Sequence, residues 1–263
     1  MPIGRRVVEL QMGEAVVFSP ADQPTEAETG PQPESTATGG RPAPRGKPSP
    51  ILDGVEALTK ALARAGYKGI TEAVAAHSVF LHPATVSQTL GKGLFRLVRD
   101  PVRRGTLGSL PDGTPVFYDD NTGPKLAFLW AARRITGPDV QYNHVWGNPR
   151  NVDTYTALWN LCATPAFLAK TTDGSNHPEV QELLKYRAFD LYGFLPVGEK
   201  EPSRPGEYDS LKWPEPPEPV ENLESLIRQR LADAPKSRPS VSARELGWLF
   251  SDGPDKSIPA PLN

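Results

Sequence analysis

The sequence has one cysteine, four histidines and no long apolar run. The single Cys162 excludes an intramolecular disulfide framework and a four-cysteine zinc site. The longest apolar run, Leu126 to Ala132, has seven residues, whereas a membrane-spanning helix needs ~20. The N-terminal residues contain no apolar stretch that could act as a secretory signal. We therefore expect a cytoplasmic protein with no membrane partner.

An excess of charge of one sign is also lacking. The chain has 29 Lys and Arg against 31 Asp and Glu, which gives a net charge of -2. Any binding of nucleic acid must therefore come from a local basic surface. Proline, in contrast, is abundant, with 30 of the 263 residues against about 5% in an average protein. This abundance indicates that part of the chain lies outside a packed core.

Composition divides the chain into four segments. Residues 1–18 alternate enough for a short β segment, and residues 19–50 lack large apolar side chains, which predicts a disordered linker. Residues 51–198 have the mixed periodicity of an α+β core built from helices and short strands. Residues 199–263 are proline-rich and predict a loosely attached extension with one amphipathic helix over 221–232.

Local signals predict the elements of the core and the extension. Asp53 can cap a helix that runs to about Ala65, and Gly193 can end the helix expected over 178–192. The apolar side chains of the extension can dock on the core or bind a protein partner through residues 221–250. The other expected elements are short helices over 70–78 and 83–90, a β-rich stretch over 95–120, helices near 124–135, 156–170 and 178–192, and a strand over 139–146.

The most informative stretch begins with a strand that ends at His144. A polar loop follows, and Asn160 comes sixteen residues after the histidine. This order resembles the HNH nuclease family, whose ββα-metal finger has a histidine at the end of its first strand and a central asparagine. The resemblance covers residues 139–192 and implies a ββα-metal-like finger within the α+β core.

The resemblance implies hydrolysis of phosphodiester bonds. It implies that His144 is the general base that takes a proton from water. It also implies that Asn160 organises the loop by bonding a backbone carbonyl across the hairpin. A divalent metal, Mg or Mn with Zn as a further candidate, would stabilise the departing oxygen. The implied metal ligands are Asn143, Asp173 and His177.

The sequence differs from the family pattern after the central asparagine. The positions of the family's third site residue hold Leu168 and Ala169, which is why Asp173 and His177 are the nearest replacements. A purely structural explanation of the motif also stands: His144 can be a hydrogen-bonded core histidine and Asn160 a helix cap. We expect Cys162 to be a buried apolar residue of the helix near 156–170, not a nucleophile.

A second polar cluster, Tyr118 to Thr122, comes before the predicted helix near 124–135. Asp and Asn side chains at this position can satisfy the free N–H groups at the start of a helix, which is the interpretation we favour. The same carboxylates could hold a hard cation, with Asp120 as a reserve ligand.

Residues 70–91 resemble a helix-turn-helix unit of the lactose-repressor type. In that arrangement Val86 and Leu90 face inward, and the side chains that face base edges are Ala84, Thr85, Ser87 and Gln88. Phe80 lies where the motif prefers a glycine in the left-handed conformation. An ordinary helical subdomain is the alternative.

A basic segment follows directly, with a local charge balance of +4. Such a cluster attracts the phosphate backbone without reading sequence, although charged runs also form ordinary solvated surfaces. The candidate nucleic-acid contacts in this segment are Lys92, Arg96, Arg99, Arg103 and Arg104.

These features favour a metal-dependent DNA endonuclease or nickase with a degenerate HNH-like site. The alternative is a non-enzymatic DNA-binding or regulatory protein that uses the helix-turn-helix-like unit. A third hypothesis is an interaction protein with no affinity for nucleic acid.

Overall fold

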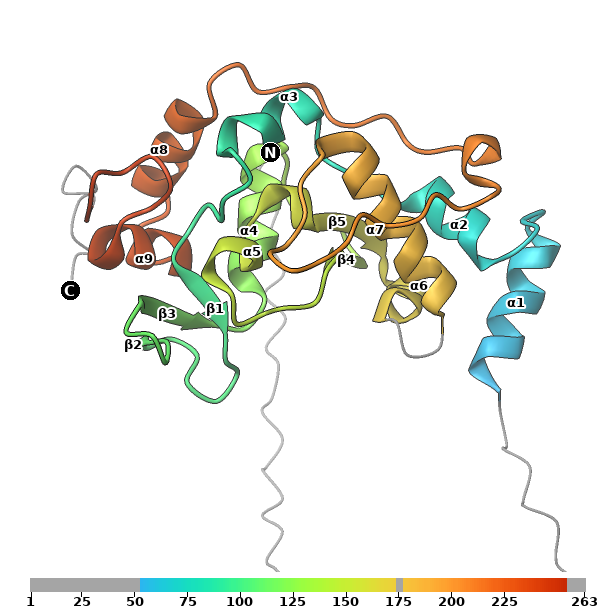
Figure 1. The fold of residues 1–263 in the computed structure, drawn as a ribbon, viewed down its shortest axis with the longest axis horizontal. Helices are drawn as coiled ribbons and strands as arrows, with labels where there is room; N and C mark the ends of the chain where they lie inside the picture. Colours follow the sequence, from blue (N-terminus) through green and yellow to red (C-terminus); the bar gives the residue numbers. More distant parts are fainter. Residues whose placement is uncertain (1–52, 174–176, 255–263) are drawn as a thin grey trace, which may run out of the picture. The chain divides into compact units, whose positions relative to one another are not determined.

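The computed structural model describes residues 53–173 and 177–254, except the side chain of Asp173. The β segment predicted over residues 1–18 and the linker predicted over residues 19–50 lie outside the described residues. The described part belongs to one compact unit of mixed α+β architecture (Figure 1).

Helices and short strands alternate along this unit. The helices are α1 (Gly54–Arg64), α2 (Ile70–His77), α3 (Pro83–Val86), α4 (Thr122–Ala131), α5 (Val152–Tyr155), α6 (Ala166–Ala169), α7 (Pro178–Tyr192), α8 (Leu223–Asp233) and α9 (Arg238–Leu246). The strands are β1 (Leu97–Arg99), β2 (Leu107–Ser109), β3 (Pro115–Asp119), β4 (Val140–His144) and β5 (Leu161–Pro165). Four 3-10 turns complete the described elements: η1 (Ser87–Thr89), η2 (Leu158–Asn160), η3 (Lys170–Asp173) and η4 (Tyr208–Ser210).

The strands form two small sheets. In the first sheet the order is β1-β3-β2, with β1 parallel and β2 antiparallel to β3. The second is the antiparallel hairpin of β4 and β5, in which Val140 pairs with Pro165 and His144 with Leu161. Val79 also exchanges backbone hydrogen bonds with Ala163, so the link between α2 and α3 lies along β5.

Two helix boundaries follow the predicted signals. The Asp53 carboxylate accepts hydrogen bonds from the first N–H groups of α1, Val55 and Glu56, as a helix cap does. Helix α7 ends at Gly193, whose φ of 69° lies in the left-handed region that glycine adopts without strain.

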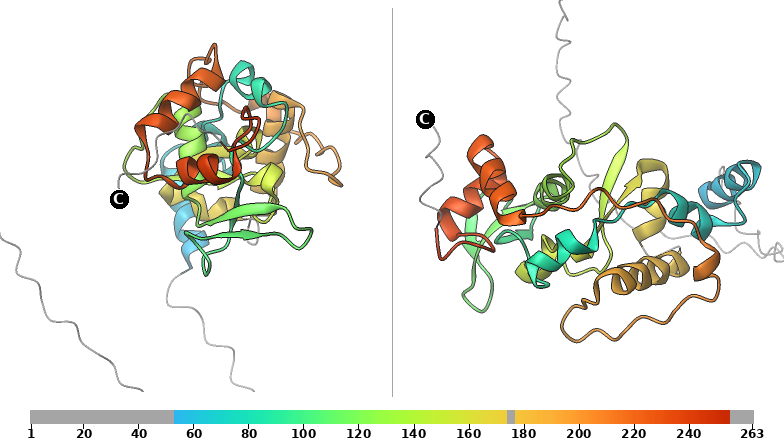
Figure 2. Two further views of the ribbon diagram at one scale, coloured as in Figure 1. Left: turned by 90° about the vertical axis from the view of Figure 1, so that its left-hand side faces the viewer. Right: turned by 90° about the horizontal axis from the view of Figure 1, so that it is seen from above.

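The helix predicted near 156–170 is wrong. That stretch contains η2, strand β5 and the short helix α6 (Figures 1 and 2). Residues Leu161 to Thr164 are buried on both faces of their strand. A continuous apolar run does not distinguish a buried strand from a helix by its periodicity. Pairing with β4 decides the conformation, because it satisfies the backbone groups of β5.

The proline-rich segment contributes to the same hydrophobic core. Leu223, Ile227 and Leu231 of α8 are fully buried, and Trp248 is nearly so. Helices α8 and α9 pack against α4, and the two views in Figure 2 show these helices side by side. The predicted loose attachment of residues 199–263 is thus corrected for the described residues, because this apolar face is covered by the core. No helix in the described ranges is long and apolar enough to cross a membrane.

Candidate active site

The β4–β5 hairpin brings together the two residues that the motif singles out. His144 ends β4, and its pairing partner Leu161 directly follows Asn160. The backbone N–H of Val145 donates to the Asn160 carbonyl at 2.9 Å, which extends the pairing by one residue. The loop of residues 145–160, which joins β4 to β5, therefore closes tightly at its base.

The His144 ring is fixed by the residue that ends α5. Its Nε2 lies 2.8 Å from the Tyr155 carbonyl oxygen, and the Tyr155 ring stacks on the imidazole with 5.2 Å between centroids. Because a carbonyl oxygen only accepts, Nε2 carries the proton and the neutral ring keeps its lone pair on Nδ1. Burial lowers the pKa of His144. The hydrogen bond to the Tyr155 carbonyl raises this pKa and the charge of Arg99 lowers it, and the net shift is downward. The ring is therefore neutral at pH 7.

Asn160 is buried and holds the loop through both ends of its amide. Its Oδ1 accepts from the Trp146 N–H at 2.7 Å, and its Nδ2 donates to the carbonyls of Trp146 and Thr154 at 3.3 and 3.1 Å. These are the bonds across the hairpin expected of a loop organiser. Thr154 precedes Tyr155, so Asn160 fixes the strand that bears His144 and the helix that holds its ring.

A buried carboxylate supports the tyrosine from the other side. Asp119, at the end of β3, has no exposed surface, and its Oδ2 accepts from the Tyr155 hydroxyl at 3.2 Å and from the Gly123 N–H at 2.6 Å. Its Oδ1 lies 3.2 Å from Nη1 of Arg238 on α9. Burial and the Asp119 charge raise the pKa of Tyr155, so its hydroxyl keeps the proton that it donates. The chain Arg238–Asp119–Tyr155 thus links the C-terminal helices to the His144 ring.

The favoured explanation of the polar cluster, helix capping, is confirmed for Asp119. The Gly123 bond satisfies an N–H group in the first turn of α4. Asp120 instead faces basic residues, with Arg104 at 3.4 Å and Arg99 at 3.9 Å.

Replacing Asp119 with asparagine is expected to lower the free energy of unfolding by about 3 kcal/mol, because it leaves the Arg238 guanidinium without its buried counter-charge. Urea denaturation at pH 7 measures this. The control is Asp112→Asn, since that exposed carboxylate caps only a turn at Thr114 and either side chain can do so. Additive losses in Asp119→Asn and Arg238→Gln would contradict a direct pairing.

His144 lines a cavity of about 260 Å³ at the loop end of the hairpin. The other polar residues that line it are Arg99, Asn121, Tyr142, Asn143, Asn148, Thr172 and Gln181. Asn148 has a φ of 144°, a strained conformation for a residue other than glycine. The cavity thus offers an imidazole, neutral oxygen donors and one guanidinium.

The implied metal ligands are only partly brought together. Asn143 lines the cavity, and its Nδ2 donates to the Thr164 hydroxyl at 2.6 Å. His177 is not among the lining residues, and its Nδ1 contacts Glu179 at 3.0 Å. The Asp173 side chain lies outside the described residues, although Thr172 before it lines the cavity.

These donors do not by themselves fit a divalent ion. Across residues 53–173 and 177–254, no group of three or more His, Cys, Asp or Glu side chains could hold a metal. Hard cations prefer carboxylate oxygens, whereas the cavity supplies amide oxygens beside the positive charge of Arg99. An ion here needs an anionic oxygen from Asp173 or from a bound phosphate.

The predicted basic contacts separate into two groups. Arg99 and Arg103 line a second cavity on the β1-β3-β2 sheet, and Arg104 lies close to Asp120. Lys92 and Arg96 line a separate hollow beside Trp248. Arg99 lines both the His144 cavity and the second cavity, so among the predicted basic contacts it is the one that lines the candidate site.

The helix-turn-helix-like unit has a different geometry from the motif. The Thr85 hydroxyl accepts from the Val220 N–H at 2.9 Å. The Gln88 amide donates to the Val220 carbonyl and accepts from the Leu223 N–H. The predicted outward orientation of Thr85 and Gln88 is therefore corrected: the C-terminal segment covers both side chains. Ser87 is exposed.

The inward-facing positions predicted for this unit agree with the structure only in part. Val86 is buried as predicted, but Leu90 is 79% exposed. The turn does not use a left-handed residue at Phe80, which is buried instead, because the adjoining Val79 pairs with β5.

Several residues of the site were not selected from the sequence. Tyr155, in the loop after His144, has no role in the predicted motif, and Gln181 is one of many polar residues on α7. Cys162 is buried as predicted, although in a strand, and burial raises the pKa of its thiol to about 12.

Comparison of the chain with protein-family models, curated proteins and solved structures finds no match. The functional argument therefore depends on the geometry of the site.

Proposed function

We propose that this protein is a DNA endonuclease or nickase that hydrolyses phosphodiester bonds at His144. The observation that carries the proposal is the hairpin whose buried Asn160 ties its loop while the Tyr155 carbonyl orients His144 beside an arginine-bearing cavity. This arrangement supplies a neutral base in a fixed tautomer next to a group that attracts phosphate.

The chain's own residues suggest how the reaction proceeds. The Nδ1 lone pair of His144 takes a proton from the attacking water, while the Nε2 bond to Tyr155 prevents rotation of the ring. Arg99 binds a non-bridging oxygen of the phosphate and offsets its negative charge. The amides of Asn143 and Gln181 can bond the water or the phosphate.

A divalent ion, Mg or Mn with Zn as a further candidate, would stabilise the departing oxygen when bound. Because the described donors are neutral, this part of the proposal depends on an anionic oxygen from Asp173 or the substrate.

The non-enzymatic alternative receives less support from the structure. Two of its three polar base-reading side chains, Thr85 and Gln88, are engaged by the C-terminal segment. The exposed Ser87 alone is insufficient for direct readout of a site.

The test is conversion of supercoiled plasmid to nicked and linear forms by the full chain, with Mg²⁺, Mn²⁺, Zn²⁺ or EDTA. We expect cleavage with at least one cation. Because the pKa of His144 is lowered, kcat/KM should rise with pH along a limb below 6.5 and be level above it, as the imidazole loses its proton. Binding of plasmid without cleavage at any of these conditions would favour the non-enzymatic alternative.

A further inference from the structure

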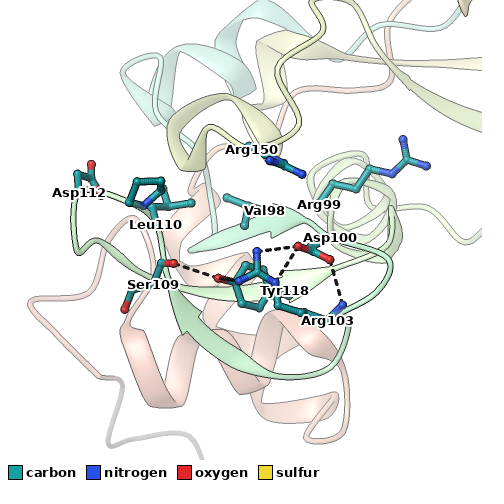
Figure 3. A pocket seen from close by; sticks show the side chains of 10 residues that line it. Val98, Arg99, Asp100, Arg103, Ser109, Leu110, Asp112, Tyr118 and Arg150 are labelled. Carbon is teal, nitrogen blue, oxygen red and sulfur yellow. Dashed lines mark hydrogen bonds and ion pairs between the residues drawn. The ribbon is translucent and has the colours of Figure 1, made fainter.

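A cavity of about 570 Å³ lies on the β1-β3-β2 sheet, next to the loop that carries Arg150 (Figure 3). Its size is in the range of small-molecule sites. Val98, Leu110 and Tyr118 give it apolar surface. Its arginines are Arg99, Arg103 and Arg150, so the cavity suits a ligand with a flat apolar part and an anionic part.

Arg103 is held as a flat platform. Its Nε and Nη2 contact Asp100 Oδ2 at 2.8 and 2.7 Å, and its Nη1 donates to the Tyr118 hydroxyl at 2.7 Å. The guanidinium carbon lies 3.8 Å from the centre of the Tyr118 ring. The Arg103 side chain is nevertheless 56% exposed. One face of the guanidinium thus rests on the tyrosine, while an accessible surface remains for stacking.

This fixed plane suits a nucleobase. Bases stack on guanidinium planes as they do on aromatic rings, with little dependence on sequence. The orientation of Arg103 is already set by Asp100 and Tyr118, so little side-chain entropy remains to be lost when a ligand binds.

The other two arginines are available for phosphate. Within the described residues Arg150 makes no ion pair, and the ion-pair partner of Arg99 is Asp120, at 3.9 Å. Figure 3 shows Arg99 and Arg150 on the same side of the cavity, across from Tyr118 and Arg103. Two guanidinium groups on one wall repel each other, and an anion between them removes that repulsion.

The two cavities are adjoining. Arg99 lines both, and its backbone N–H donates to the Pro149 carbonyl at 2.7 Å. Pro149 lines the His144 cavity, whereas the next residue, Arg150, lines the second cavity. The shared Arg99 and the successive residues Pro149 and Arg150 therefore connect the two cavities along one surface.

We propose that this second cavity binds one unstacked nucleotide of the substrate strand, next to the phosphate that is cut. Its base stacks on Arg103 and its phosphate contacts Arg99 and Arg150. The identification of the ligand as part of a DNA strand rests on the proposed function, but the binding can be measured without cleavage.

The test measures fluorescence anisotropy of a labelled oligothymidine of about 12 nucleotides, in EDTA, with the full chain. Arg103→Lys keeps the charge but loses the plane, and we expect it to weaken binding about tenfold. Arg150→Gln should lower the slope of log Kd against log salt by about 0.7. The matched control is Arg64→Gln on α1, an exposed arginine that lines neither cavity, which should bind as wild type does.

Equal affinity of wild type and Arg103→Lys would overturn the inference. So would the same tenfold loss with a duplex of equal length, because a duplex offers no unstacked base. Thermal unfolding shows whether each variant is folded. Arg150→Gln removes an exposed side chain that makes no hydrogen bond or ion pair within the described residues, so this variant tests the site if Arg103→Lys does not fold. If oligothymidine binding depends on Arg103 while no plasmid is ever cut, the proposed function fails and the binding site stands.

Discussion

His144→Ala is expected to reduce the rate of plasmid cleavage at least a hundredfold. A positioned general base contributes about 10²–10⁴-fold to such a reaction, and alanine removes the imidazole that lines the His144 cavity. The Arg99 side chain and the amides of that cavity remain, so binding of oligothymidine should be close to that of wild type. Initial rates of nicking at saturating protein measure the effect on the chemical step.

The matched control is His77→Ala. His77 is also half-buried and also has one hydrogen-bond partner, the Tyr67 hydroxyl at 2.7 Å, but it lines neither cavity. This variant should cleave at the wild-type rate at a temperature where it is folded. Cleavage that survives in His144→Ala would contradict the site assignment and indicate either another base or a contaminating nuclease.

Asn160→Asp should lower the free energy of unfolding by about 3 kcal/mol and greatly reduce cleavage. The substitution is isosteric and keeps the acceptor for the Trp146 N–H. It replaces the amide donor by an oxygen that faces the carbonyls of Trp146 and Thr154 in a buried position. Leaving buried groups unsatisfied costs about 1–3 kcal/mol each, and more for a charged group.

The effect on cleavage follows from the position of the loop. Because Thr154 directly precedes Tyr155, a shift at Asn160 moves the carbonyl that orients the His144 ring. A misplacement of about 1 Å can reduce a rate about 100-fold. Unfolding in urea and nicking rates on the same samples separate lost stability from lost alignment.

Asn151→Asp is the control for this substitution. Asn151 uses only its Oδ1, which accepts from the Asp153 N–H at 2.8 Å at the start of α5. Aspartate serves equally well as an N-cap, so this variant should unfold and cleave like wild type. If Asn160→Asp were as mild as Asn151→Asp, Asn160 would not be the residue that holds the loop.

Local signals were sufficient for several elements of this protein. Asp53 begins α1 and Gly193 ends α7, because caps and stops act within one turn of the backbone. The motif also indicated that His144 and Asn160 belong to one hairpin, because only a short loop separates them along the chain. The mixed α+β class follows from these short elements and their alternation.

Tertiary contacts decided the rest. Leu161 to Thr164 form a strand because β4 pairs with them, whereas the same apolar run is compatible with a helix. Thr85 and Gln88 turn to residues more than a hundred positions away. Asp119, Tyr155 and Arg238 meet only when β3, α5 and α9 pack together. Side-chain periodicity reports which face is buried, but it carries no information about which distant segment buries it.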